Sequence, residues 1–374
     1  MIGRRTLLQA AAAVFGGAFA AACGGGAKDS ASDLASATTD SRRWSMPDEA
    51  DRHTRTWMAF AAREDIWGAR LSPEVKRNLA AVAVAVSRFE PVSLLVPHAE
   101  MELARKLIGA ANVELVACEV DDLWIRDTGP VFVKNGPTWA GVDFNFNGWG
   151  GKQEHESDSK VAGFVADRAG VETLGTELVL EGGAVEVDGE GTAIITESSV
   201  LNDNRNRGWS KARVERELDR LLGVSKVIWL PGVKGKDITD GHTDFYARFA
   251  SPGTIVAALE TDPESFDYNV TRRHLEILRA STDARGRKLT VEVMESPSSV
   301  REQFASDDFA DGYINFYVCN NAVIGPQFGA ADTDTAARET MQRLFPNREI
   351  VQINIDGIAA GGGGIHCATQ QQPA

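Results

Sequence analysis

The chain has 374 residues, of which 43% are hydrophobic and 25% are charged, with 36 glycines and 13 prolines. This composition is typical of a globular protein with one large domain or two to three smaller ones, and it excludes a fibrous or wholly disordered chain. The formal net charge of -14 argues against a general affinity for nucleic acid, which needs clustered lysine and arginine.

Residues 1–22 have the pattern of an export signal. Arg4 and Arg5 precede an apolar run that is too short and too rich in alanine and glycine to predict a membrane span. The adjacent arginines resemble a twin-arginine signal. The small residues before Cys23 resemble a lipoprotein processing box, which predicts lipidation of Cys23 and an anchor on the outer face of the cytoplasmic membrane. Ordinary cleavage near the same alanines is the alternative, and it would leave a soluble exported protein.

Residues 23–43 are rich in Gly, Ala, Ser, Thr and Asp and cannot bury enough apolar surface to fold. We therefore expect a disordered tether here and a single folded domain over residues 44–374.

Helical and strand patterns alternate through the rest of the chain. The predicted helices cover residues 72–89, 99–108, 157–169, 210–222, 269–280 and 335–344. The predicted strands cover residues 92–97, 113–120, 131–135, 138–146, 185–187, 193–196, 226–231, 246–259 as a pair, 289–295, 313–325 as a long strand or hairpin, and 349–355. This alternation predicts an α/β domain, although periodicity alone does not distinguish a closed ring of units from an open sheet.

The cysteines beyond residue 23 are of two kinds. Cys118 and Cys319 lie in strand-like apolar runs, which favours packing in the core. A disulfide between them stays open, because connectivity does not follow from sequence. Cys367 follows four glycines, Gly361 to Gly364, which allow a close approach of the backbone to a ligand. A thiolate is the strongest nucleophile among ordinary side chains, so Cys367 is the candidate nucleophile.

The histidine that works with Cys367 is expected to come from another segment. His366 is adjacent to Cys367, and neighbours in an extended chain point to opposite faces. His242 lies two residues before Asp244, and in an extended segment both side chains would point to one side. A carboxylate there would raise the pKa of the histidine and keep it available as an acid near neutral pH.

Two further carboxylates stand in polar loops. Asp127 follows Arg126 and could be only half of an ion pair, whereas Glu181 precedes two glycines and could be only a turn residue. A thiol, a histidine and several carboxylates suit a planar cationic substrate, because a guanidinium pairs with carboxylates through a bidentate fork. A zinc site built from His242, Asp244 and Cys367 lacks the paired spacing of known zinc motifs, so no metal is predicted.

These segments resemble the agmatine deiminase family of guanidino-group-modifying enzymes, with the Porphyromonas-type peptidylarginine deiminases as near relatives. The resemblance runs from Trp44, through Met46-Pro47-Asp48-Glu49, to Gln371. It is carried by Trp-Ile-Arg-Asp-Thr-Gly-Pro (124–130), Phe-Asn-Gly-Trp-Gly-Gly (146–151), Leu-Glu-Gly-Gly (180–183) and the Gly-Gly-Gly-x-Ile-His-Cys-x-Thr-Gln-Gln pattern that ends at residue 371.

The resemblance implies a pentein, an α/β propeller of five ββαβ-like units in a pseudo-fivefold arrangement. It implies Cys367 as nucleophile, His242 as general acid and base, Glu181 beside that histidine, and Asp127 and Asp244 as guanidinium ligands. Further substrate contacts are expected from Trp124, Arg126, Trp149 and Gly363. No metal or organic cofactor is implied.

The implied reaction converts agmatine into N-carbamoylputrescine and ammonia through a covalent amidino-thioether on the cysteine. Thr243, Phe245 and the stretch after Trp67 depart from the family pattern, which leaves recognition of the substrate tail open. Peptidyl-arginine or another guanidino compound is therefore an alternative substrate. An exported, non-catalytic lipoprotein that binds guanidino compounds or polyamines is an alternative of another class. The oligomeric state does not follow from the sequence.

Overall fold

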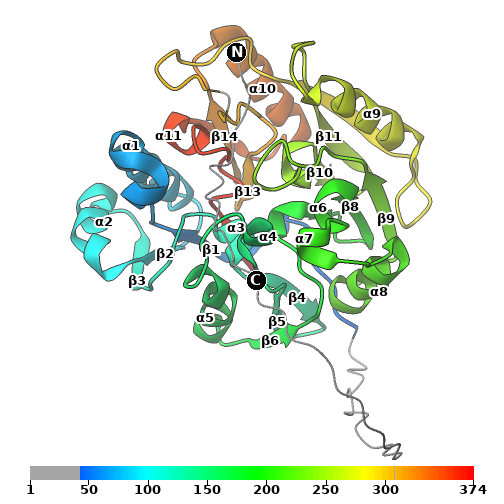
Figure 1. Ribbon diagram of the computed structural model, residues 1–374, viewed down its shortest axis with the longest axis horizontal. Coiled ribbons are helices and arrows are strands. Elements are labelled where there is room, and N and C mark those ends of the chain that lie inside the picture. Colours follow the sequence, from blue (N-terminus) through cyan, green and yellow to red (C-terminus); the bar gives the residue numbers. More distant parts are fainter. Residues whose placement is uncertain (1–42, 307) are drawn as a thin grey trace, which may run out of the picture. The chain divides into compact units, whose positions relative to one another are not determined.

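The computed structural model describes residues 43–306 and 308–374. Within this part of the chain the strands form five separate sheets, with helices packed beside them (Figure 1). The predicted α/β class is thereby confirmed.

Four of the sheets have three strands and share one strand order. In each, an antiparallel hairpin is followed by a helix and then by a third strand parallel to the second. The first of these sheets contains β4 (Val131–Asn135), β5 (Thr138–Asp143) and β6 (Glu172–Gly175), with α5 (Val161–Ala169) before the last strand. The second contains β7 (Val185–Val187), β8 (Thr192–Thr196) and β9 (Lys226–Leu230), with α8 (Lys211–Leu222). The third contains β10 (Ala247–Ser251), β11 (Thr254–Leu259) and β12 (Thr290–Glu295), with α9 (Asp267–Ala280). The fourth contains β13 (Tyr317–Cys319), β14 (Ala322–Gln327) and β15 (Glu349–Asn354), with α10 (Ala331–Leu344).

The fifth sheet joins segments from opposite ends of the described chain. Its order is β16 (Gln370–Pro373), β1 (His53–Ala59), β2 (Val92–Val96) and β3 (Val113–Ala117). The helices α1 (Glu64–Val86) and α2 (Met101–Ile108) connect its parallel strands. β16 pairs antiparallel with β1, so that His53 lies opposite Pro373. This pairing fixes the segment just after Cys367 against the first strand.

Short helical turns at the ends of the strands carry the polar motifs. They are α3 (Ile125–Thr128), α4 (Gly148–Gly151), η3 (Gly182–Ala184), η4 (Thr243–Phe245), α7 (Asp203–Asn206) and α11 (Asp356–Ala359). The remaining short helices are η1 (His98–Glu100), η2 (Asp158–Lys160) and α6 (Glu197–Val200). Since loops on a rigid scaffold commonly carry functional groups, these turns are where a site is expected.

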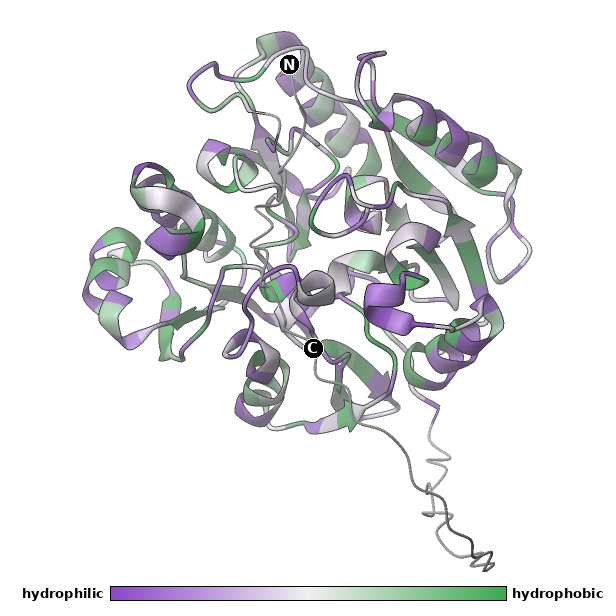
Figure 2. Ribbon diagram, in the orientation of Figure 1, coloured by the Kyte–Doolittle hydropathy of each residue, from purple (hydrophilic) through white to green (hydrophobic). Residues whose placement is uncertain are grey.

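The sheets are held by apolar side chains from strands and helices together. Every residue of β2 and of β8 is buried, as expected for strands covered on both faces. Figure 2 shows the strands as largely hydrophobic, whereas α9 has hydrophilic and hydrophobic residues in alternation along its length. The four apolar clusters thus anchor the strand ends from which the site is built.

The first predicted helix begins earlier than expected. The sequence predicts a start at Ser72, whereas α1 begins at Glu64 and is interrupted at Gly68, where φ is 71°. Pro73 lies in the first turns after this interruption, where a missing N–H group costs little. Ser72 does not cap the helix; its hydroxyl donates to the carbonyl of Ala62 at 2.5 Å.

Several strands also differ from the prediction. β1, β6 and β16 were not predicted, and residues 313–316 are not part of a strand. The predicted strand over 138–146 ends at Asp143, and the one over 113–120 ends at Ala117. The remaining predicted helices and strands are confirmed within a few residues of their ends.

The predictions for the N-terminal segment fall outside the described residues. They are the export signal over 1–22, the lipidated Cys23 and, except for Arg43, the tether over 23–43; all three stay predictions. No helix in the described ranges is both long and apolar enough to cross a membrane.

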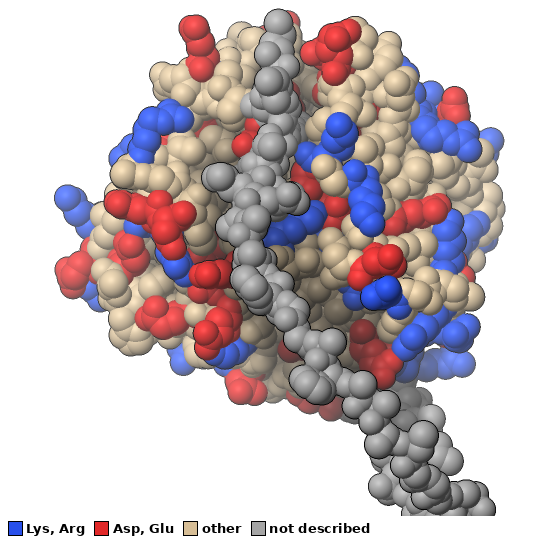
Figure 3. All heavy atoms as spheres, viewed as in Figure 1, with Lys and Arg blue, Asp and Glu red and all other residues tan. Residues whose placement is uncertain are grey.

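On the face shown in Figure 3, acidic and basic side chains are intermixed over the uncovered surface, so the net negative charge is not gathered in one patch there.

Candidate active site

Cys367 lies in a tight turn between α11 and β16 and is almost fully buried, with 7% of its surface exposed. Its Sγ is 3.4 Å from Oδ2 of Asp244 and 3.3 Å from Nδ2 of Asn315. The preceding glycines are required by close packing. A Cβ at Gly364 would lie 2.4 Å from Oδ1 of Asn315.

Three polar side chains from two segments of the chain, α3 and the loop with η4 between β9 and β10, meet at Gly183, in η3. A Cβ at this position would lie 2.7 Å from Nδ1 of His242, 2.9 Å from Oδ1 of Asp127 and 3.2 Å from Oδ2 of Asp244. Only glycine leaves room for these groups, which are therefore packed around one backbone position.

Asp127, in α3, is held by two donors. Its Oδ2 accepts from the indole N–H of Trp149 at 2.9 Å, and its Oδ1 accepts from the backbone N–H of Gly183 at 3.0 Å. Nδ1 of His242 lies 3.7 Å from Oδ1 of Asp127. Burial raises the pKa of Asp127 above its usual value, against the opposing charge of His242, and the nearby carboxylates add to the rise.

Glu181 lies on the other side of the imidazole. Its Oε2 is 3.4 Å from Nε2 of His242, and its two oxygens accept from Nε of Arg205 at 2.7 and 3.0 Å. Burial raises the pKa of Glu181, but the charges and hydrogen bonds of Arg205 and His242 together outweigh it and leave the pKa below its usual value. Glu181 is thus an anion beside the histidine.

His242 is a buried imidazole with a strongly raised pKa. Burial alone would lower the pKa, but the carboxylates of Asp127, Glu181 and Asp244 raise it from 6.5 to about 9. At neutral pH the ring is therefore an imidazolium that can give up a proton.

Asp244 reaches the site by a route that the sequence did not predict. The segment is not extended: Thr243–Phe245 form the 3-10 turn η4. Oδ2 of Asp244 accepts from Nδ1 of His366 at 2.8 Å. Its Oδ1 is buried and has no hydrogen-bond partner among the described residues. Burial raises the pKa of Asp244, but the bond to His366 and the charges of His366, His242 and Arg248 leave it below its usual value. Oδ1 of the ionised Asp244 therefore has room to accept a hydrogen bond from a cationic group of a substrate bound beside the thiol.

The surroundings of Cys367 favour the thiol over the thiolate. Burial raises the pKa of Cys367 well above its usual value, and the charges of Asp244 and Asp127 raise it further. The structure therefore does not contain a preformed thiolate.

A pocket opens over these groups. It is lined by Trp124, Asp127, Trp149, Gln153, Ile238, Thr239, His242, Phe245, Gly361, Gly362, Gly363 and Cys367. Five expected site residues, Trp124, Asp127, Trp149, His242 and Gly363, thus line it together with Cys367. Glu181 and Asp244 are not in the lining but contact His242 and Cys367.

Arg126 does not face the pocket, contrary to expectation. Its guanidinium is buried and donates to Oε1 of Gln370 at 2.7 Å, to Oε1 of Gln371 at 2.8 Å and to Oε2 of Glu49 at 3.1 Å. The ion pair between Asp127 and Arg126, the alternative considered from sequence, is not among the contacts of these two residues. Arg126 instead ties β16 to the segment that carries Asp127.

Sequence reasoning missed four residues of the site: Glu49, Arg205, Asn315 and His366. Glu49 had been noted only as part of a motif, although its carboxylate bonds Arg126, Arg248 and His366. His366 had been set aside because an extended chain would turn it away, but the turn at residues 364–369 points it at Asp244. No local pattern announces Arg205 or Asn315, because their partners are 24 and 52 residues away.

The other cysteines take no part in the site. Cys319 is buried in the core, whereas Cys118 is half-buried, and both are free, so the disulfide left open by the sequence is not formed. Within the described ranges, no group of three or more His, Cys, Asp or Glu side chains is placed to hold a metal ion.

Comparisons with known proteins agree with this geometry. A family model described as Porphyromonas-type peptidyl-arginine deiminase matches residues 45–373. A putative agmatine deiminase of Streptomyces coelicolor is 43% identical over 343 residues, covering 88% of this chain and 98% of the relative. The agmatine deiminase of Pseudomonas aeruginosa is 38% identical over 354 residues, covering 88% and 95%. A solved structure of agmatine deiminase from Enterococcus faecalis superposes with a TM-score of 0.82 at 32% identity, covering 88% and 96%.

Proposed function

Because this chain belongs to the Porphyromonas-type peptidyl-arginine deiminase family, we propose that it is a hydrolase that cleaves a guanidino C–N bond, with agmatine as its substrate. The products would be N-carbamoylputrescine and ammonia. The observation that carries the proposal is the thiol of Cys367, whose Sγ lies 3.4 Å from Oδ2 of an ionised Asp244. The other oxygen of Asp244 is buried and has no hydrogen-bond partner within the described part of the chain.

The two aspartates suit recognition of a guanidinium. Asp127 and Asp244 both lie close to Gly183, and both are buried carboxylates near Cys367. A bound guanidinium would donate to them and would bring a positive charge beside Cys367. The same charge would lower the pKa of Cys367, so that the nucleophile forms only when substrate is present.

The reaction then has two halves. As the guanidinium binds, the Cys367 thiol gives its proton up to solvent. The thiolate then forms a bond from Sγ to the guanidinium carbon, one C–N bond breaks, and ammonia leaves with a proton from His242. An amidino-thioether remains on the cysteine. Water then adds to this carbon as His242 takes its proton back, the C–S bond breaks, and a ureido product departs while the thiol is restored. Glu181, itself held by Arg205, keeps His242 in the cationic form that the first half needs.

The charge of the residues that line the pocket favours a substrate without a carboxylate group. Among the residues that the structure describes, no Lys or Arg lines this pocket or the adjoining one, which is lined in part by Asp237, Glu260 and Asp267. A free arginine would bring its carboxylate into this acidic surrounding without a partner, whereas the amine of agmatine would not.

The architecture and the N-terminal segment belong to the same proposal. Four sheets share one strand order, and β16, β1 and β2 of the fifth sheet repeat its antiparallel and parallel pairings, which supports a pseudo-fivefold ring of ββαβ-like units. The match over residues 45–373 supports a single catalytic domain over 44–374. We also propose export through the twin-arginine signal with lipidation at Cys23. Mass spectrometry of the mature N-terminus would check this, and an unprocessed Met1 would contradict it.

Ammonia release by the purified protein tests the function. Agmatine, free arginine and an arginine-containing peptide are compared, with Cys367→Ser as the inactive variant and Cys118→Ser as the matched control. We expect release from agmatine by the wild type and by Cys118→Ser, with unchanged thermal unfolding of Cys367→Ser. Release from the peptide alone would assign the chain a peptidyl-arginine substrate. Full activity of Cys367→Ser would contradict the mechanism, and binding without any release would favour the non-catalytic guanidino-binding protein.

A further inference from the structure

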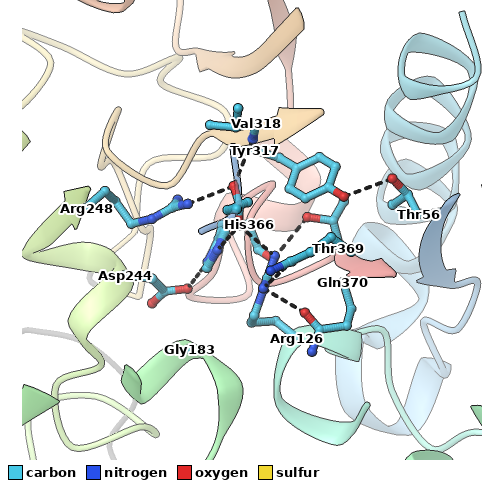
Figure 4. Close-up of polar contacts among 12 residues, drawn as sticks. Thr56, Arg126, Gly183, Asp244, Arg248, Tyr317, Val318, His366, Thr369 and Gln370 are labelled. Atoms are coloured by element: carbon cyan, nitrogen blue, oxygen red, sulfur yellow. Dashed lines mark hydrogen bonds and ion pairs between the residues drawn. The ribbon is translucent and has the colours of Figure 1, made fainter. Parts of the chain in front are cut away.

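His366, the neighbour of the proposed nucleophile, is buried between two carboxylates, those of Asp244 and Glu49. Figure 4 shows its ring directed at Asp244. Its Nδ1 is 2.8 Å from Oδ2 of Asp244, and its Nε2 is 2.8 Å from Oε2 of Glu49. A neutral imidazole has one N–H group and could satisfy only one of these two acceptors.

Neither carboxylate has a proton to offer the ring. Oε1 of Glu49 accepts from Arg248 at 2.8 Å and from the backbone N–H of Val318 at 2.8 Å, while its Oε2 accepts from Arg126. Oδ2 of Asp244 accepts from the thiol of Cys367 as well as from His366. Both nitrogens of His366 must therefore donate, which requires an imidazolium.

The balance of the surrounding charges agrees. Glu186, the third carboxylate of this buried group, accepts from Nε of Arg248 at 3.0 Å and from the backbone N–H of Phe249 at 2.9 Å, so it too is ionised. The group then holds the carboxylates of Glu49, Glu186 and Asp244 and the guanidiniums of Arg126 and Arg248. The His242 imidazolium also faces Asp244, but it lies between Asp127 and Glu181. A protonated His366 is the cation that contacts both Glu49 and Asp244, and a buried carboxylate without a cation is costly.

We propose that His366 is a positioning residue, an imidazolium that keeps Asp244 ionised and turns its Oδ1 toward the guanidinium of the substrate. The inference rests on the proposed function, because it concerns how that substrate is bound. Since Oδ2 of Asp244 is occupied by His366 and the thiol, only Oδ1 is left to accept from a guanidinium. His366 acts through Asp244 and does not itself touch the reacting carbon.

The test measures agmatine binding rather than turnover. Calorimetry compares the full-length Cys367→Ser protein with the double variant Cys367→Ser/His366→Gln at pH 6, 7 and 8. A glutamine amide can still donate to Asp244 but carries no charge. Without the imidazolium, burial would raise the pKa of Asp244, so we expect weaker binding that recovers by up to about tenfold per pH unit as Asp244 ionises. The affinity of the parent variant Cys367→Ser should change much less with pH. Because Asp127 is present in both variants, its titration affects both affinities alike and is removed by the comparison.

A matched control uses His98, whose side chain is 78% exposed and forms a 3.0 Å ion pair with Glu119. His98→Gln in the same background should bind agmatine as the parent does. Equal affinity of the His366→Gln variant, or a loss that does not depend on pH, would overturn the inference and leave His366 a packing residue. Absence of turnover in the wild type would instead refute the proposed function.

A second measurement covers the case in which the double variant does not fold. NMR of the wild-type protein with ¹⁵N-labelled histidine reports the protonation of each ring nitrogen at neutral pH. The chain has six histidines, and substitution of the other five assigns the signal of His366 by elimination. Protons on both nitrogens are expected, and a ring with a single proton would overturn the inference.

Discussion

The indole ring of Trp124 occupies the space that a side chain on Gly363 would need. A Cβ built on Gly363 would lie 2.2 Å from Cζ3 of Trp124, and one on Gly361 would lie 2.0 Å from Cη2 of Trp67. The two indoles are themselves neighbours, with ring centroids 5.8 Å apart. The glycine loop before Cys367 therefore lies directly against the aromatic wall of the pocket.

Substitution of Gly363 by alanine should harm the site more than the fold. The added methyl group would push Trp124 or the loop away, and overpacking of this kind costs about 1–3 kcal/mol. We expect a large fall in kcat/KM for agmatine. Gly163→Ala is the control, since Gly163 lies in α5 with open space around it and should tolerate the methyl group. Equal activities of the two variants would show that the close approach of Trp124 has no role.

Asp122 should prove to be the residue that holds this wall. It accepts from the indole N–H of Trp67 at 2.8 Å, from that of Trp124 at 3.1 Å and from Gln153 at 3.0 Å. Each carboxylate oxygen of Asp122 accepts from two donors, so in Asp122→Asn two donors would face an amide N–H group, and each unsatisfied donor costs about 1–3 kcal/mol. We expect a raised KM for agmatine and a lowered melting temperature. Asp65→Asn, at an exposed ion pair, should change neither, and an unaltered KM in Asp122→Asn would contradict this role.

Arg205 should matter to stability far more than any exposed arginine. Its removal leaves Glu181 buried without its cation, and breaking such a pair costs about 3–5 kcal/mol. Urea unfolding of Arg205→Met should show this loss. The comparison is Arg88→Met, whose partner Glu349 is half exposed and whose loss should cost at most about 1 kcal/mol. Similar losses in the two variants would argue against a buried charge network behind His242.

The raised pKa of His242 should appear in the pH dependence of stability. Because the pKa rises from 6.5 in the unfolded chain to about 9 in the folded one, protonation of His242 stabilises the fold fully below pH 6.5. That contribution, about 3 kcal/mol, is lost as the pH rises through 9. The unfolding free energies of wild type and His242→Gln should therefore converge by this amount between pH 6 and 9.5. His98→Gln should run parallel to the wild type, and a constant gap for His242→Gln would contradict the charged imidazole.

The sequence identified the candidate catalytic residues more completely than the residues that hold them in place. Cys367, His242, Asp127 and Glu181 stand in loops marked by glycine and by short polar motifs, and the structure brings all four together. Their supporting residues carry no such mark. Arg248 contacts Glu49 across 199 residues, and only the folded chain shows that this pair exists.

The predicted helices and strands are wrong where tertiary contacts override the local preference of the sequence. β16 consists of three glutamines and a proline, a composition with no strand signal, and it is a strand because β1 offers a partner. Asp244 was expected beside His242 on an extended segment, yet a 3-10 turn directs it to His366 instead. Local periodicity cannot foresee either outcome.

The pairing of β1 with β16 has a kinetic consequence. His53 and Pro373 meet across more than three hundred residues, so this sheet is the one whose formation depends on the longest loop closure. Cys367 stands three residues before β16 and is positioned by the same closure. Folding intermediates in which the other four sheets are complete would hold Asp127, Glu181 and His242 but lack the seated thiol. Activity would thus be among the last properties to return when the unfolded chain is allowed to refold.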